Sequence, residues 1–117
     1  MSSKKYNVIE DKSFKFAVRI VNLYKYLISE KKEFVLSKQI LKYGTSIGAN
    51  TEEALGGVSN SDFSNKLSIA YKEARETLYW LRLLNATDYL EVKVFQSMFN
   101  DCDEICKILF TIIRKTK

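Results

Sequence analysis

The side chains in this sequence best suited to chemistry are basic and aromatic, and they recur at helical spacing. Lys72, Arg75, Tyr79 and Arg82 follow one another at intervals of three, four and three residues, so a helix would place them on one face. Cations neutralise phosphates, and an exposed tyrosine can stack on a base. This face is therefore a candidate surface for nucleic acid, either RNA or DNA.

Two further lysines and the net charge bear on the same surface. Lys38 and Lys42 lie one turn apart in another predicted helix, where we expect them to extend the basic face. Lys and Arg outnumber Asp and Glu by 19 to 14, which gives a formal charge of +5. That charge favours polyanions modestly but falls short of a dedicated basic arm. The alternative is a solvated face on which Lys72 pairs with Glu76 at the next turn.

Catalytic chemistry finds little support in the sequence. The chain has no histidine, so the usual general base is absent, and neither a Glu-x-x-His di-iron site nor a common Ser or Cys triad can be built. Glu52 and Glu53 are adjacent and diverge by about 100° on a helix. Glu73 and Glu76 lie among basic residues, as surface ion pairs do. We expect no enzyme activity, no catalytic residues and no cofactor.

The two cysteines and the hydropathy pattern limit the remaining classes. Cys102 and Cys106 lie four residues apart on an apolar helical face, as small core residues do. A zinc site needs about four ligands, so no metal site is expected. Residues 1–13 lack a continuous apolar run, and no later stretch could span a bilayer. We expect a cytoplasmic protein that does not associate with membranes.

Four segments carry apolar side chains at helical spacing. The sequence has no proline, and its four glycines all lie between Gly44 and Gly57, so the flanking stretches lack the strongest helix breakers. The predicted core stripes are Phe14, Ala17, Val21, Tyr24 and Ile28; Leu36, Ile40, Ile47, Thr51 and Ala54; Phe63, Leu67, Ala70, Ala74, Leu78, Leu81 and Leu84; and Val92, Phe95, Phe99, Cys102, Ile105, Leu109 and Ile112.

Helix ends follow from capping residues and glycines. The first helix is expected over about residues 13–31, and the second should end at Gly56 and Gly57 in a left-handed conformation. The predicted N-caps are Asp11 or Ser13 for the first helix, Ser37 for the second, Ser59 with Asp62 for the third and Asp88 with Glu91 for the fourth. Connections of about four to six residues force successive helices to run antiparallel. The sequence thus predicts an all-α single domain over residues 1–117, an antiparallel up-down-up-down four-helix bundle with a flexible N-terminus at residues 1–12.

Two of the helices carry a second apolar stripe. Soluble monomers rarely expose large apolar patches, so these stripes predict a homo-oligomer, and the alternative is a broad core face. The predicted interface residues are Phe16, Ile20, Leu23 and Leu27 in the first helix and Ile69, Trp80 and Leu83 in the third.

Two glycines fall inside the second predicted helix. Gly44 and Gly48 each cost roughly 1 kcal/mol there relative to alanine, so something must compensate. Small residues let another backbone approach closely, which predicts a tight helix crossing, within the bundle or between subunits. The glycines fit neither GxxxxGK nor GxGxxG, so nucleotide binding is not expected.

A set of motifs at fixed spacing lies between Phe34 and Leu84. The motifs are Gly44-Thr45-Ser46-Ile47-Gly48-Ala49-Asn50, Glu52-Glu53-Ala54, Ser59 with Asp62-Phe63, Lys66-Leu67, Ile69-Ala70, Lys72-Glu73-Ala74-Arg75-Glu76-Thr77, Tyr79-Trp80-Leu81 and Leu83-Leu84. With these motifs the chain resembles the bacterial four-helix-bundle family named after intervening sequences in 23S ribosomal RNA genes. The outer helices match that family in pattern alone.

The resemblance implies an antiparallel four-helix bundle, often assembled as a ring-like pentamer, in a family whose members are mostly of unknown function. A distant relative, the accessory protein of diversity-generating retroelements, is a basic pentamer that binds nucleic acid and a reverse transcriptase, which favours nucleic-acid binding by analogy. The first hypothesis is therefore a non-catalytic oligomer that binds nucleic acid. The second is a protein-interaction scaffold with no nucleic-acid binding.

Overall fold

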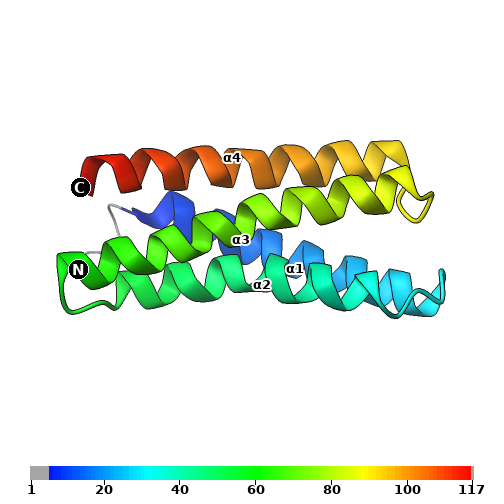
Figure 1. The fold of residues 1–117 in the computed structure, drawn as a ribbon, viewed down its shortest axis with the longest axis horizontal. Helices are drawn as coiled ribbons and strands as arrows, with labels where there is room; N and C mark the ends of the chain where they lie inside the picture. Colours follow the sequence, from blue (N-terminus) through cyan, green and yellow to red (C-terminus); the bar gives the residue numbers. More distant parts are fainter. Residues whose placement is uncertain (1–5, 117) are drawn as a thin grey trace.

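A computed structural model describes residues 6–116, which form four α-helices joined by short loops (Figure 1). The helices are α1 (Asn7–Ser29), α2 (Leu36–Leu55), α3 (Asn60–Ala86) and α4 (Val92–Thr116). The loops at residues 30–35 and 87–91 lie at one end of the molecule, and the loop at 56–59 lies at the other (Figure 1). The predicted all-α, antiparallel four-helix bundle is confirmed.

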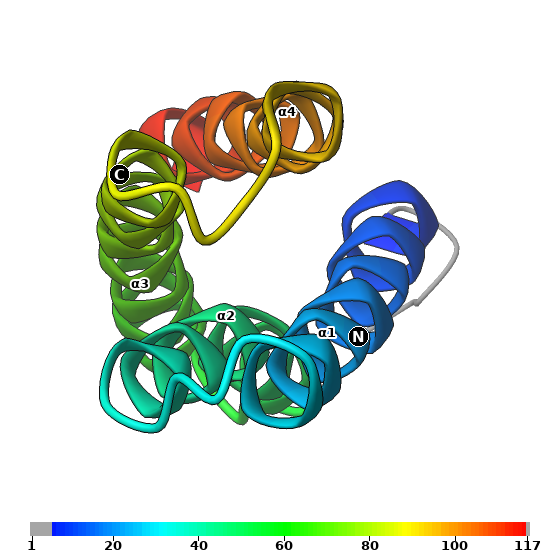
Figure 2. The same ribbon diagram turned by 90° about the vertical axis from the view of Figure 1, so that its right-hand side faces the viewer.

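The bundle is elongated, with principal extents of 43 × 20 × 19 Å. Viewed from one end, the helices follow one another around an arc, with α1 and α4 at its two ends (Figure 2). Each helix packs on the next in the sequence, whereas α1 and α4 approach one another less closely (Figure 2). The buried side chains of all four helices meet inside this arc, and they include Ile20, Ile47, Leu81 and Leu109.

The stripe of α1 that faces the core differs from the prediction. Phe16, Ile20, Leu23 and Leu27 are between 0% and 5% exposed and belong to the core of the single chain. Their assignment to a subunit interface is therefore wrong, because side chains enclosed within one chain cannot contact a second one. The stripe predicted to face the core is the outer one, and its Phe14 is 66% exposed. The sequence thus predicts both apolar stripes of α1, but it assigns the core to the Phe14 stripe and the interface to the Phe16 stripe.

The N-terminal part of α1 also corrects the prediction. The helix begins at Asn7, so residues 7–12 are helical rather than flexible, and Ile9 is only 1% exposed. Ser13 lies inside the helix, where its hydroxyl donates a hydrogen bond to the Glu10 carbonyl at 3.1 Å. Neither Asp11 nor Ser13 is therefore the N-cap. The rest of the predicted flexible segment, residues 1–5, lies outside the described residues.

The N-terminus of α2 is capped by an acidic residue and not by Ser37. The Glu33 carboxylate accepts hydrogen bonds from the backbone N–H groups of Val35, Leu36 and Ser37 at 3.2, 3.0 and 2.7 Å. Burial alone raises the pKa of Glu33, but the hydrogen bonds outweigh it and hold the pKa below its ordinary value. Three N–H groups that an α-helix leaves unpaired are thus satisfied by one side chain.

The remaining helix ends give a mixed result. Ser59 is the N-cap of α3, as predicted, and its Oγ accepts from the Asp62 N–H at 3.0 Å. Gly56 ends α2 with φ −91° rather than in the left-handed region. Asp88 does not cap α4, which begins at Val92. It adopts φ 69° just after α3, and its N–H donates to the Asn85 carbonyl at 3.2 Å.

The glycines of α2 mark a helix crossing within the bundle. A Cβ atom at Gly44 would lie 2.6 to 2.8 Å from three side-chain carbons of Ile20, and one at Gly48 would lie 3.3 Å from the Ser13 carbonyl oxygen. Both contacts are with α1. The predicted tight crossing is confirmed, and it joins α1 to α2 in the same chain.

Candidate nucleic-acid interface

The outer face of α3 presents the basic residues as the sequence predicts. Lys72, Arg75, Tyr79 and Arg82 are all exposed, while Ala70, Ala74, Thr77 and Leu81 on the opposite face are completely buried. The helix is positioned by this buried stripe, and the charged face follows from the 3.6-residue period. We call these four exposed residues the α3 basic face.

Within residues 6–116, no ion pair neutralises the cations of the α3 basic face. The ion pairs found within residues 6–116 are Lys12–Glu104, Lys15–Asp11, Arg19–Asp101, Lys66–Glu53 and Lys107–Asp103. None of them includes Lys72, Arg75 or Arg82. The alternative in which Lys72 pairs with Glu76 is therefore not observed, and these positive charges face solvent.

Aromatic side chains flank the α3 basic face on both sides. Tyr79 is 53% exposed and contacts the edge of Trp80 with ring centroids 5.2 Å apart and the planes at 77°. Toward α4, the Arg75 guanidinium donates to the Tyr71 hydroxyl at 3.5 Å. A shallow groove of about 350 Å³ runs between these helices, and Arg75, Tyr71 and Phe110 line part of it. The face therefore combines free cations with rings available for stacking.

The two lysines of α2 remain a predicted extension of this face. Lys38 and Lys42 are exposed, and the Lys42 ammonium lies 5.4 Å from the ring centre of Tyr43. A hydrogen bond to Glu76 and the nearby negative charges of Glu76 and Glu73 raise the pKa of Tyr43. Acidic side chains of α3 thus lie next to Tyr43, the residue that follows Lys42, so a surface that joins Lys42 to the α3 basic face would include negative as well as positive charges.

The predicted interface residues of α3 are distributed differently from those of α1. Ile69 is 40% exposed, whereas Trp80 and Leu83 are half-buried. Trp80 packs partly against the core, and its indole Nε1 is buried with no hydrogen-bond acceptor among the described residues. These three residues of α3 remain a predicted oligomer interface, which no longer includes the four buried residues of α1.

The apolar surface that the prediction missed lies on the outer side of α1 and α2. Phe14 and Val18 are 66% and 46% exposed. Beside Phe14, a shallow hollow of about 210 Å³ is lined by the small residues Ala17, Thr45 and Ala49. The sequence contains the signal for this surface, because Phe14 and Ala17 are apolar residues on one side of the helix, but their pattern predicts a core position.

The cysteines behave as core residues. Cys102 is 0% and Cys106 is 5% exposed, and both thiols are free. The Cys102 thiol donates to the Ala74 carbonyl at 3.3 Å. Its hydrogen bond with Cys106 and its burial raise the pKa of Cys102, so it stays protonated.

Residues 6–116 contain no cluster of three or more His, Cys, Asp or Glu side chains suited to a metal ion. In the same range, every helix is too short or too polar to cross a membrane.

The fold and this face together define a class: an all-α bundle protein with an unpaired basic surface. Residues 5–111 match the family described as 23S rRNA-intervening sequence protein, and the chain belongs to that family. The match extends the similarity seen between Phe34 and Leu84 to nearly the whole chain. The descriptive name of the family specifies no enzymatic activity.

One solved structure shows the same architecture in a relative. It is the crystal structure of a protein with unknown function from the S23 ribosomal protein family of Bacteroides thetaiotaomicron. The two chains are 59% identical over 92% of this chain and 96% of that chain, with a TM-score of 0.91. No curated protein matches the chain.

Proposed function

We propose that this protein acts in the cytoplasm as a non-catalytic accessory protein that binds nucleic acid through the α3 basic face. The observation that carries the proposal is that Lys72, Arg75 and Arg82 are exposed and belong to none of the ion pairs within residues 6–116. Their spacing along α3 is about 15 Å from first to last at 1.5 Å per residue. Several successive phosphates of a single strand fit within that length.

The expected affinity is set by charge rather than by base sequence. Phosphate neutralisation releases counterions, so binding should weaken steeply as salt rises. Tyr79 adds a stacking surface that every base can use. We therefore expect a preference for single-stranded over fully paired RNA or DNA, with little discrimination among sequences.

Replacing Lys72, Arg75 and Arg82 together with alanine should weaken binding to a mixed-sequence single strand by roughly 10- to 100-fold at low salt. The slope of log affinity against log salt should fall by about 2, since each phosphate contact contributes about 0.7. Fluorescence anisotropy with a labelled oligonucleotide at several salt concentrations measures both quantities.

A matched control separates the face from net charge. The triple variant Lys25→Ala, Lys93→Ala and Lys115→Ala removes three exposed cations elsewhere and lowers the net charge equally. It should retain most of the affinity. Equal weakening by the two triple variants would indicate diffuse attraction, and absence of binding by the wild type at low salt would reject the proposal.

The second candidate function is a protein-interaction scaffold, and the exposed apolar surface of α1 favours it. Phe14 lies beside the small residues Ala17, Thr45 and Ala49, which would let another helix approach closely, and Val18 is a second exposed apolar side chain of α1. Self-association through this surface is the simplest version, and a pentamer is what the family resemblance implies. Self-association by itself is also compatible with the first proposal, because the α3 basic face would be repeated in an oligomer.

Replacing Phe14 and Val18 with serine should shift an oligomer toward the monomer by at least tenfold in dissociation constant, because the apolar area that an interface would bury is removed. Sedimentation equilibrium at micromolar concentration gives the mass. Phe34→Ser is the control, since Phe34 is similarly exposed at 54% but lies in the loop at 30–35. A monomeric wild type would contradict self-association.

A further inference from the structure

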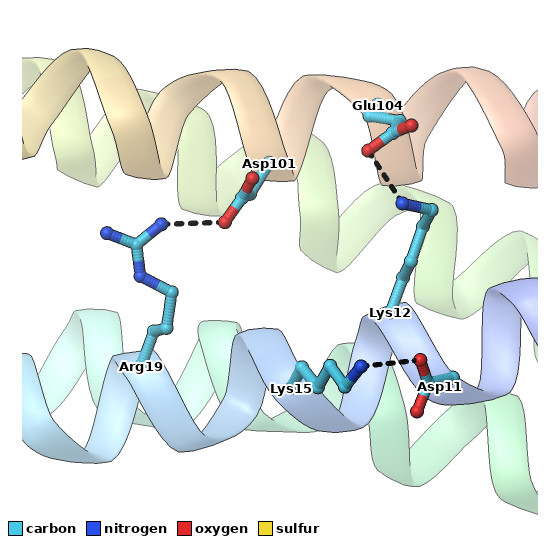
Figure 3. A network of polar contacts seen from close by, with 6 residues as sticks. All are labelled: Asp11, Lys12, Lys15, Arg19, Asp101 and Glu104. Atoms are coloured by element: carbon cyan, nitrogen blue, oxygen red, sulfur yellow. Dashed lines mark hydrogen bonds and ion pairs between the residues drawn. The ribbon is translucent and has the colours of Figure 1, made fainter.

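Ion pairs and hydrogen bonds link α1 to α4 along the seam between these two helices. The Lys12 ammonium lies 3.1 Å from Glu104, and the Arg19 guanidinium donates to Asp101 at 2.6 Å (Figure 3). The same Arg19 nitrogen, Nη1, also donates to the Ser97 hydroxyl at 3.0 Å. This is the side on which the arc of helices is open (Figure 2).

A cavity lies along this seam between Arg19 and the loop at 87–91. Its volume is about 480 Å³, which is within the range of small-molecule sites. Leu23, Leu90 and Met98 form an apolar floor and are 5%, 4% and 2% exposed. The complete lining is Arg19, Asn22, Leu23, Tyr26, Leu90, Glu91, Val94 and Met98.

The two ends of the cavity carry opposite charges. Arg19 is at the end nearer the middle of the bundle, and Glu91 is at the end formed by the loop. One terminal nitrogen of Arg19 bonds Asp101, while the other points away from Asp101 along the seam, in the direction opposite to Glu104 (Figure 3). That is the side on which the cavity lies. Within residues 6–116, the hydrogen bonds of the Arg19 guanidinium are those of Nη1, so Nη2 keeps its donors available.

We propose that this cavity binds a linear amphiphilic carboxylate, with the carboxylate on Arg19 and the aliphatic chain on the Leu23, Leu90 and Met98 floor. A guanidinium matches a carboxylate in geometry as well as charge. From Arg19 to Tyr26 the wall formed by α1 rises roughly 10 Å, which suits a medium-length fatty acid such as octanoate. Glu91 repels a carboxylate at the far end and thereby fixes the orientation of the chain.

Other ligand classes fit the cavity less well. An alkylamine would place a cation against Arg19 or, in the opposite orientation, would pair only with Glu91, whose exposed carboxylate gives a weak, solvent-screened ion pair. An uncharged alkyl alcohol would leave the Nη2 donors without an ionic partner. Nucleic acid would meet Glu91, Asp101 and Glu104 along the seam, and the α3 basic face lies on a different helix. The site is therefore independent of the proposed nucleic-acid binding.

Octanoate should bind the full chain saturably, with a Kd of about 1 mM or tighter. The chain has two methionines, so methyl-labelled methionine gives two NMR signals, and Met98→Leu identifies the one in the cavity. That signal should shift on titration with octanoate below its aggregation concentration. Octanol should bind about tenfold more weakly, and octylamine should not bind.

Three variants decide between the carboxylate site and a merely apolar hollow. Arg19→Gln should weaken octanoate about tenfold and leave octanol unchanged, whereas Asp101→Asn, which frees the guanidinium, should leave octanoate binding equal or tighter. Val94→Trp should fill the cavity and abolish both. Val92→Trp, on the same helix at a position that is 56% exposed and outside the lining, is the control for folding.

Two outcomes would overturn the proposal. Equal affinities for octanoate and octanol in the wild type would show that Arg19 does not recognise the carboxylate. A Met98 signal that fails to move, or that moves without saturation, would show that the cavity is not a binding site for this class of molecule.

Discussion

Substitution of Gly44 by valine is expected to lower the free energy of unfolding by about 3 kcal/mol, measured by urea denaturation. A Cβ at this position would lie 2.6 Å from Ile20 Cγ1, 2.7 Å from Cδ1 and 2.8 Å from Cγ2. Ile20 is 0% exposed, so its side chain cannot move out into solvent to avoid the contact. Valine also gains little helix propensity over glycine, whereas alanine would recover about 1 kcal/mol and should cost less.

Gly56→Val provides the matched control, because the nearest atom to a Cβ there is 3.8 Å away and its φ is −91°. It should change stability by less than about 1 kcal/mol. A second control tests the contact itself: Ile20→Ala alone should cost about 2–5 kcal/mol, but combined with Gly44→Val it should cost less than the sum by 1 kcal/mol or more. Additive effects would show that the crossing of α1 and α2 does not depend on this contact.

The glycine contact explains why the core of α1 was misassigned while that of α3 was not. In α3 one stripe, from Phe63 to Leu84, is continuously apolar and has no competitor of equal length. In α1 two stripes are equally apolar, and Ile20 faces inward because it fits the space that Gly44 leaves. This contact is between residues of two different helices, so it cannot be predicted from the apolar pattern of α1 alone.

A sequence signal for α1 nevertheless existed further upstream. The Phe16 stripe continues to Ile9, which is 1% exposed, whereas the Phe14 stripe continues to the polar residues Asn7 and Glu10. The predicted helix begins at Ser13, so the prediction does not include the residues that distinguish the two stripes. The Phe16 stripe is the longer one, and the longer apolar stripe is the one that a bundle buries.

The two candidate sites also differ in whether their residues lie on one helix or on several. The α3 basic face could be read from spacing because all its members lie on one helix, and their exposure follows from the buried face opposite. Whether their charges are free depends on side-chain conformations, both of Glu76 on the same helix and of acidic residues on other helices, and these cannot be predicted from spacing. The cavity at the seam could not be read at all, because Arg19 and Asp101 are brought together from the two ends of the chain.

The N-terminus of α2 gives the second large effect. Replacing Glu33 with alanine should reduce the free energy of unfolding by about 2–3 kcal/mol at pH 7, since three backbone N–H groups lose a charged acceptor. Glu33 is 9% exposed, so water replaces the carboxylate only in part. Ser37→Ala, at the residue that sequence alone favoured as the cap, should cost less than about 1 kcal/mol, because its backbone N–H still donates to Glu33.

The pH dependence follows from the direction of the shift. Hydrogen bonds from three backbone N–H groups hold the pKa of Glu33 below its ordinary value in the folded chain, so the folded state binds the proton less tightly than the unfolded state. The stabilisation is complete above about pH 5 and is lost as the pH falls through the folded pKa. The difference in unfolding free energy between the wild type and Glu33→Gln should therefore be largest near neutral pH and shrink toward pH 3.

The effect of Glu33 is the difference in unfolding free energy between the wild type and Glu33→Gln at each pH. The pH dependence of the wild type alone does not give it, because another carboxyl group contributes. Burial and a hydrogen bond with Glu10 raise the pKa of Glu52, so Glu52 favours the folded state at low pH and opposes the trend from Glu33. Subtracting the two denaturation curves at each pH cancels the contribution of Glu52, which both proteins share. A difference that stays constant from pH 7 to pH 3 would mean that the Glu33 carboxylate does not hold the start of α2 through its charge.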